Sequence, residues 1–151
     1  MGEQAVIRVA SIGDAEGLQA CMTSAYATYK DRMGDATLPP MELDYAEEIR
    51  SFPTWVAVLD GEIVGGLTMM FEENHASIAN IAVSPAAQGY GLGRTLLEFA
   101  EARAQDNGLT EMRLATHVLL TENIDLYTHL GWSEYDRDNL RVYMKKTLAN
   151  Q

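Results

Sequence analysis

Apolar and polar positions repeat with two different periods along the chain, and the two periods predict alternating strands and helices. Short apolar runs and period-two alternation are typical of strands, whereas apolar residues at every third or fourth position are typical of helices. We expect strands over residues 5–10, 54–59, 62–72, 76–83, 111–116, 132–136 and 141–146. We expect one helix with Asp14 as its N-cap, ended by residues 34–40, and others over 43–50, from Thr95 to near Gly108, and over 122–130.

Turn residues indicate how these elements connect. Asp60-Gly61 lies between two predicted strands and suits a type I′ hairpin, so this part of the sheet is expected to be antiparallel. The connections are short, and we find no repeat and no obvious linker. With 151 residues, 47% of them hydrophobic, the chain is long enough for one domain over residues 1–151. The predicted fold class is α/β (α+β), with a mixed, mostly antiparallel central sheet and helices on both faces.

A glycine-rich run lies between the strand predicted over 76–83 and the helix predicted from Thr95. It reads Gln88-Gly89-Tyr90-Gly91-Leu92-Gly93-Arg94. Three alternate glycines allow N–H groups to converge at the positive end of a helix dipole, and such a site binds phosphate or pyrophosphate. The spacing differs from the Gly-x-Gly-x-x-Gly of a dinucleotide-binding turn, and the Gly-Lys-Ser/Thr of a Walker loop does not follow. A plain connecting turn is the alternative to anion binding.

Two signatures in the second half of the chain resemble those of the GCN5-related N-acetyltransferases (GNAT family). Gln88, Gly91 and Gly93 match the family's Gln/Arg-x-x-Gly-x-Gly/Ala, which follows a strand and precedes a helix. About 30 residues later, the order Asn, helical Tyr, Leu-Gly-aromatic recurs as Asn123, Tyr127 and Leu130-Gly131-Trp132. The resemblance covers residues 81–132 strongly and the N-terminal half only by its layout.

The resemblance implies an acyltransferase that moves an acetyl group from acetyl-CoA to an amine by direct attack. The resemblance implies that Ile81, Ala82 and Val83 contact the pantetheine arm of acetyl-CoA, as does Asn123. It implies that the glycine-rich loop binds the pyrophosphate, through Gln88 and the amides of Gly89, Tyr90, Gly91, Leu92, Gly93 and Arg94. Tyr127 is implied as the general acid that protonates the leaving thiolate, with a core aromatic residue as the alternative. We expect Thr121 to be the N-cap of the helix that carries both Asn123 and Tyr127.

The general base is not identified by either signature. An alkylammonium ion has a pKa near 10.4 and must lose a proton before it attacks, so a carboxylate or a histidine is expected nearby. The strand over 76–83 carries no carboxylate, although some family members have one there. The candidates at strand ends are Glu72, Glu73, His75 and His117, each with a solvated loop residue as its alternative.

Net charge and composition limit the kinds of partner that we expect the chain to bind. The net charge of −11 disfavours nucleic acid. Acidic residues crowd residues 31–48, which favours a cationic amine of a small molecule or peptide, with a solvated face of an acidic protein as the alternative. A single cysteine, Cys21, excludes a disulfide framework and a multi-cysteine zinc site, and we expect it to be a buried apolar residue and expect no metal.

We find neither a signal peptide nor a membrane span and expect a cytoplasmic protein without membrane contact. The sequence leaves open a homodimer, a non-catalytic acyl-CoA sensor, and an enzyme that acts on proteins or aminoacyl-tRNA.

Overall fold

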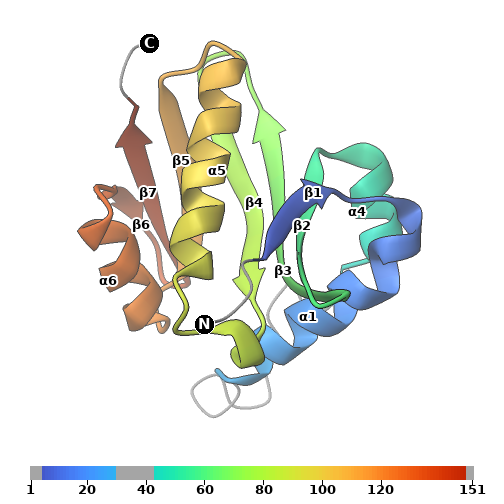
Figure 1. Ribbon diagram of the computed structural model, residues 1–151. Helices are drawn as coiled ribbons and strands as arrows, with labels where there is room; N and C mark the ends of the chain where they lie inside the picture. Colours follow the sequence, from blue (N-terminus) through green and yellow to red (C-terminus); the bar gives the residue numbers. More distant parts are fainter. Residues whose placement is uncertain (1–4, 30–42, 149–151) are drawn as a thin grey trace. The chain divides into compact units, whose positions relative to one another are not determined.

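The computed structural model describes residues 5–29 and 43–148 (Figure 1). Its strands are β1 Val6–Val9, β2 Thr54–Leu59, β3 Glu62–Phe71, β4 Ala76–Val83, β5 Glu111–His117, β6 Ser133–Arg137 and β7 Arg141–Thr147. Its helices are α1 Ala15–Ala27, α4 Tyr45–Ser51, α5 Leu92–Asp106 and α6 Thr121–His129, with short 3-10 helices at Ile12–Asp14 and Pro85–Ala87. The predicted order of elements is confirmed, while the break expected at 34–40 lies outside the described residues.

The strands follow the order β1-β2-β3-β4-β5-β7-β6. The pairs β1–β2, β2–β3, β5–β7 and β6–β7 are antiparallel, and β4–β5 is parallel, with Ala76 opposite Met112. A parallel pair needs a long crossover, and α5 is the helix in that connection. At the predicted hairpin, Asp60 and Gly61 have φ of 53° and 81°, as a type I′ turn requires. The mixed, mostly antiparallel sheet is therefore confirmed.

The chain divides into two compact units, and each is described by itself. The first comprises Met1–Met69 with Asn80–Glu98, and the second comprises Met70–Ala79 with Phe99–Gln151. Strands β3 and β4 and helix α5 therefore each contribute residues to both units.

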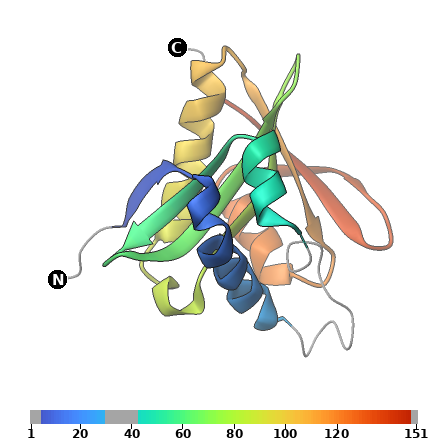
Figure 2. The ribbon, with the colours of Figure 1, turned by 90° about the vertical axis from the view of Figure 1, so that its right-hand side faces the viewer.

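Two neighbouring glycines of β3 show that helices cover both faces of the sheet in the first unit. A Cβ added to Gly66 would clash with Leu18 Cδ1 of α1, whereas one added to Gly65 would lie 3.2 Å from Leu96 Cδ1 of α5. Successive strand residues point to opposite faces, so α1 and α5 lie on opposite sides of β3. Figure 2 shows α4 on the same side as α1. A core cluster forms on the α1 and α4 side, from Ala10, Leu18, Met22, Ala25, Tyr45, Val56 and Ala82.

Cys21 lies on the buried side of α1, as the sequence predicts, with 4% of its surface exposed. Burial raises the pKa of its thiol to about 11, although a hydrogen bond with the backbone of Ser84 acts in the opposite direction. Cys21 is thus a small apolar core residue in the first unit.

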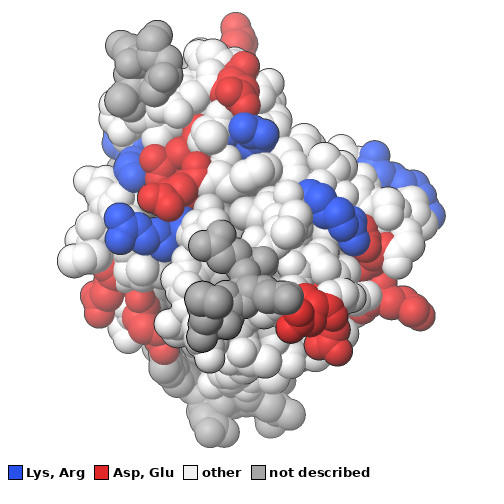
Figure 3. Space-filling model, in the orientation of Figure 1, with Lys and Arg blue, Asp and Glu red and all other residues white. Residues whose placement is uncertain are grey.

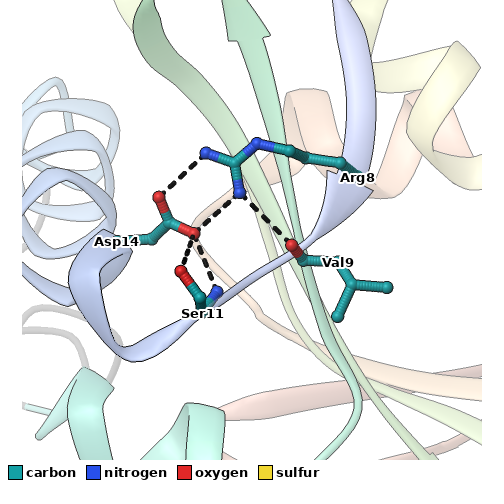
Figure 4. Close-up of polar contacts among 4 residues, drawn as sticks. All are labelled: Arg8, Val9, Ser11 and Asp14. Atoms are coloured by element: carbon teal, nitrogen blue, oxygen red, sulfur yellow. Dashed lines mark hydrogen bonds and ion pairs between the residues drawn. The ribbon is translucent and has the colours of Figure 1, made fainter.

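The start of α1 is fixed by Asp14, but not through a bond to the helix itself. Asp14 is the N-cap residue, as predicted, yet its side chain makes no capping hydrogen bond to α1. Its carboxylate instead accepts two hydrogen bonds from the Arg8 guanidinium, at 2.8 and 2.9 Å, and one from the Ser11 amide at 2.8 Å (Figure 4). These contacts hold the pKa of Asp14 well below its ordinary value, with the Arg8 hydrogen bonds as the largest cause. The group ties β1 to the entry of α1.

The second unit contains the C-terminal part of α5, the whole of α6 and the antiparallel strands β5, β7 and β6. An ion pair of 3.0 Å joins Lys146 Nζ of β7 to Glu101 of α5. The expectation that Thr121 caps α6 is wrong, because the helix starts one residue earlier and Leu120 is its N-cap. The carbonyl of Leu120 accepts hydrogen bonds from the amides of Asn123 and Ile124, so Thr121 already belongs to the first turn.

Candidate functional site

The glycine-rich run folds as a tight turn between β4 and α5. Gly89 and Gly91 have φ of 89° and 78°, a region that side chains disfavour, so both need to be glycine. Gly93 does not lie in that region. It belongs to α5, which starts at Leu92 rather than at Thr95 as predicted. The earlier start places two of the three glycines, not all of them, in the turn.

The first turn of α5 presents backbone donors next to free space. The amides of the first residues of a helix have no partner within that helix, and the dipole adds partial positive charge there. The Thr95 amide and hydroxyl both donate to the Gly91 carbonyl at 3.0 Å, which fixes the turn. Among the described residues, a Cβ added at Gly89 or Gly91 would meet no atom within 4 Å, and one at Gly93 would meet Val83 Cγ2 alone, at 4.0 Å. The loop therefore has the donors and the room that a pyrophosphate group needs.

The side chains of the loop take different parts. Gln88 Nε2 donates to the Val83 carbonyl at 3.1 Å, so this amide braces the loop against the end of β4. Leu92 is buried, and only its backbone can contribute to a ligand site. Tyr90 is 84% exposed. Arg94 lies on the exposed surface 3.7 Å from Glu98, so it adds positive charge near the loop through a weak surface pair.

Residues 81–83 of β4 lead into this loop. The Tyr26 hydroxyl donates to the Ile81 carbonyl at 3.1 Å, and the Val83 carbonyl accepts from Gln88. The Ala82 side chain belongs to the core cluster of the first unit. The carbonyls of Ile81 and Val83 are thus both hydrogen-bonded to side chains of the same unit, which holds the end of the strand.

A contact that sequence reasoning missed lies one residue before this segment. Asn80, which is 8% exposed, donates from Nδ2 to Glu48 Oε1 of α4 at 3.2 Å. Burial raises the pKa of Glu48, and the hydrogen bond from Asn80 lowers it by less. Asn80 and Glu48 are 32 positions apart in the sequence. The one sequence signal of this contact is that a polar Asn occupies a buried position of a mostly apolar strand.

In the second unit, α6 carries the other signature residues. Asn123 is half-buried and Tyr127 is 8% exposed; one turn apart, they lie on the same face of the helix. The Tyr127 ring lies 6.0 Å from the Trp132 ring, and its carbonyl accepts from the Trp132 amide at 2.9 Å. Trp132 is 2% exposed, so the Leu-Gly-Trp signature packs against the Tyr it follows.

The base candidates predicted at strand ends lie in the second unit. Glu72 and Glu73 are exposed, and His75 is half-buried in the turn that joins β3 to β4. His117 ends β5, and its Nδ1 accepts a hydrogen bond from the Leu119 amide at 3.1 Å. This hydrogen bond occupies the Nδ1 lone pair of His117.

The described acidic residues of the 31–48 segment make contacts within their own helix or with β4. Asp44 caps α4 by accepting from the Glu47 amide, and Glu47 accepts from Arg50 at 3.2 Å and from Ser51 at 2.9 Å. The acidic residues at 31, 35 and 42 lie outside the described part. On the face shown in Figure 3, acidic and basic side chains are interspersed among the described residues.

The described residues contain neither a metal-binding cluster nor a membrane-spanning helix. No cluster of three or more His, Cys, Asp or Glu side chains suited to hold a metal ion occurs within 5–29 and 43–148. Over the same ranges, every helix is too short or too polar to cross a bilayer.

Known proteins resemble this chain in sequence. It is 32% identical over 108 residues to the uncharacterized N-acetyltransferase YjgM of Escherichia coli (strain K12), a match that covers 66% of this chain and 64% of that protein. It is 33% identical over 70 residues to the mycothiol acetyltransferase of Renibacterium salmoninarum, covering 46% of this chain and 21% of that protein. The matches thus span less than two thirds of either relative.

Solved structures share the fold over nearly the whole chain. The PaiA N-acetyltransferase of Thermoplasma acidophilum, solved in complex with coenzyme A, has a TM-score of 0.82 at 22% identity and covers 96% of this chain and 99% of that one. The ribosomal-protein-S18-alanine N-acetyltransferase of Escherichia coli has a TM-score of 0.75 at 20% identity, covering 97% and 96%. The model of the acetyltransferase (GNAT) family matches residues 18–132. This match takes in the glycine-rich loop, Tyr127 and Trp132, and the chain belongs to the acetyltransferase (GNAT) family.

Proposed function

We propose that this chain is an N-acetyltransferase that moves the acetyl group of acetyl-CoA to a primary amine of a small molecule or peptide. The observation that carries the proposal is the turn at Gly89 and Gly91, which opens α5 with room in front of its unpaired amides. Membership of the GNAT family supports the same reading. The family match covers residues of both compact units, and we propose that they act together as one domain.

Acetyl-CoA supplies the activated acyl group as a thioester, and the loop amides of residues 89–94 would hold its pyrophosphate. The helix dipole and the Arg94 guanidinium favour the negative charge there, against the net charge of −11 of the whole chain. Backbone groups of Ile81, Ala82 and Val83 and the amide of Asn123 would contact the pantetheine arm. Gln88 would act indirectly by bracing the loop through its bond to Val83.

Tyr127 is proposed as the general acid. A phenol with a reference pKa near 10 can protonate or hydrogen-bond a departing thiolate, whose conjugate acid has a pKa near 8.5. Its position one turn after Asn123 supports the role, because both side chains lie on one face of α6. Its low exposure and its packing on Trp132 would keep the ring in a fixed orientation.

The acceptor is proposed to be cationic, because residues 31–48 hold six carboxylates. In the described part, however, Asp44 and Glu47 are engaged inside α4, so the attraction would rest mainly on the remaining carboxylates. Glu72 and His117 are carried forward as candidate bases. A homodimer is a further possibility, and light scattering distinguishes it from a monomer.

A panel of amines assayed with acetyl-CoA, with the release of free thiol as the readout, tests the function. We expect amine-dependent thiol release, together with a rise in melting temperature when acetyl-CoA is added alone. A thermal shift without turnover on any amine would indicate a sensing module, and turnover confined to proteins or aminoacyl-tRNA would move the acceptor to a macromolecule. The absence of both effects would overturn the proposal.

A further inference from the structure

Strand β4 carries no carboxylate of its own, yet the fold supplies one to it. Glu48 lies on α4, and its Oε1 accepts the hydrogen bond from Asn80 at 3.2 Å. Asn80 precedes Ile81, the first of the residues proposed to contact the pantetheine arm. Glu48, Asn80 and Ile81 all belong to the first unit. A carboxylate from the helix therefore reaches the strand beside the expected path of the cofactor.

The helix separates Glu48 from its acidic neighbour. Consecutive helical residues point about 100° apart, because an α-helix has 3.6 residues per turn. Glu47 uses both carboxylate oxygens on Arg50 and Ser51, with 63% of its side chain exposed, whereas Glu48 turns toward Asn80. Among the described residues, the second oxygen of Glu48 makes no hydrogen bond or ion pair. The neighbouring glutamates Glu47 and Glu48 thus have different environments.

The surroundings of Glu48 favour its protonated form more than water does. Partial burial raises the pKa of Glu48. Burial also raises the pKa of the Tyr45 phenol on the same helix, and the proximity of Glu48 adds to that shift. Cys21 of α1 adds to the same effect on Tyr45, and Asn80 of β4 is the neutral donor. Within the described residues, the groups facing this carboxylate are thus a phenol and an amide, rather than a cation that would hold it ionised.

We propose that Glu48 is the general base of the reaction and that Asn80 is its positioning residue. The assignment rests on the proposed acetyl transfer. Oε2 of Glu48 accepts a proton from the ammonium form of the acceptor, directly or through one water. The freed nitrogen lone pair forms the N–C bond with the thioester carbon while the C–S bond breaks. The nitrogen gives up its second proton as the amide forms, and one proton passes to the departing thiolate through the general acid, which is thereby regenerated. Glu48 then returns its proton to solvent, so an ammonium ion and acetyl-CoA give an amide, free CoA and one proton.

Variants at three positions test the assignment, with the amine that gives the wild-type protein its highest kcat/KM. Glu48→Gln keeps an acceptor for Asn80 but cannot take a proton, so kcat at neutral pH is expected to fall about 100-fold and the ascending limb of the pH profile to disappear. Glu47→Gln removes the same charge from the same helix and is expected to keep the limb at its wild-type position. Asn80→Asp places a like charge beside Glu48 and should move the limb to higher pH.

The outcomes separate the two proposals. A wild-type protein without amine-dependent thiol release overturns the proposed function and the assignment of Glu48 with it. An active wild-type protein with an unchanged rate and limb in Glu48→Gln overturns only the assignment of Glu48, as does loss of the limb in Glu72→Gln or His117→Gln instead. Folding is controlled by melting temperature and by the acetyl-CoA thermal shift. Glu48→Gln should melt no lower than the wild type, because folding no longer has to bury a charge there.

Discussion

Replacing Gly93 by Asp would place a carboxylate where the pyrophosphate is proposed to bind, and the chain can accept the side chain without strain. The backbone of Gly93 lies outside the positive-φ region, and its new Cβ would make an ordinary contact with Val83 Cγ2 at 4.0 Å. A glycine in a helix costs up to about 1 kcal/mol relative to other residues, and an acidic residue in the first turn adds about 0.3–1 kcal/mol of stability. Without ligand, Gly93→Asp is therefore expected to melt a few degrees above the wild type.

The effect of ligand should be the opposite. At a hundredfold excess of acetyl-CoA over Kd, the wild type gains about 2.7 kcal/mol, or roughly 5–10 °C at 2–4 °C per kcal/mol. Two like charges 4 Å apart repel by about 4 kcal/mol at an effective dielectric constant of 20, which is enough to raise Kd by about a thousandfold. The acetyl-CoA shift of Gly93→Asp should therefore vanish, as measured by differential scanning fluorimetry.

Gly93→Asn is the matched control, because Asn has the shape of Asp without its charge. We expect it to keep a substantial part of the acetyl-CoA shift. A full shift in Gly93→Asp would refute the placement of the pyrophosphate at the start of α5. An equal loss in both variants would refute the electrostatic reasoning and leave steric exclusion as the cause.

Three further predictions concern catalysis, the acceptor and folding. Tyr127→Phe should lower kcat by one to three orders of magnitude, roughly the contribution of general acid catalysis, while the acetyl-CoA shift persists; an unchanged kcat would make Tyr127 a core aromatic only. The apparent affinity for cationic amines should weaken as salt rises above about 0.15 M, since exposed charges are screened beyond about 8 Å there, and a preference for anionic amines without a salt response would contradict the acidic rim. Asp14→Asn should lower stability at pH 7 by about 1 kcal/mol, given that Arg8 is 47% exposed. Because folding lowers the pKa of Asp14, its stabilisation is present above the unfolded value near 3.9 and is lost as pH falls below it, so the melting curves of wild type and variant should converge in acid.

Elements with strong local signals were predictable from the sequence. The hairpin at Asp60-Gly61 and the strand at 76–83 follow from turn chemistry and apolar patterning, and the structure has both at the predicted places. The helix starts were less accurate, because capping depends on contacts the pattern does not contain. Leu92 is apolar and buried, so α5 extends back into the glycine-rich run. Asp14 faces Arg8 rather than the helix it precedes.

The candidate site likewise contains local motifs that the sequence predicts and a long-range contact that it does not. The glycine-rich loop and the Asn123 and Tyr127 pair are local motifs, and each is visible within a few residues of sequence. The contact between Glu48 and Asn80 joins positions 32 residues apart and depends on how α4 packs beside α1. Glu48 does not stand out within its acidic stretch, and the one local sign of the contact is the polar Asn80 in a mostly apolar strand.

The burial of Cys21 makes this thiol a built-in reporter of opening in the first unit. It is the sole cysteine of the chain, and both its low exposure and its raised pKa keep the reactive thiolate scarce in the native state. Thiol reagents used to follow CoA release should therefore register product with little background from the native protein. The same reagents, applied without substrate, should label Cys21 only as fast as the packing between α1 and the sheet opens, and acetyl-CoA should slow that labelling if its binding steadies the fold.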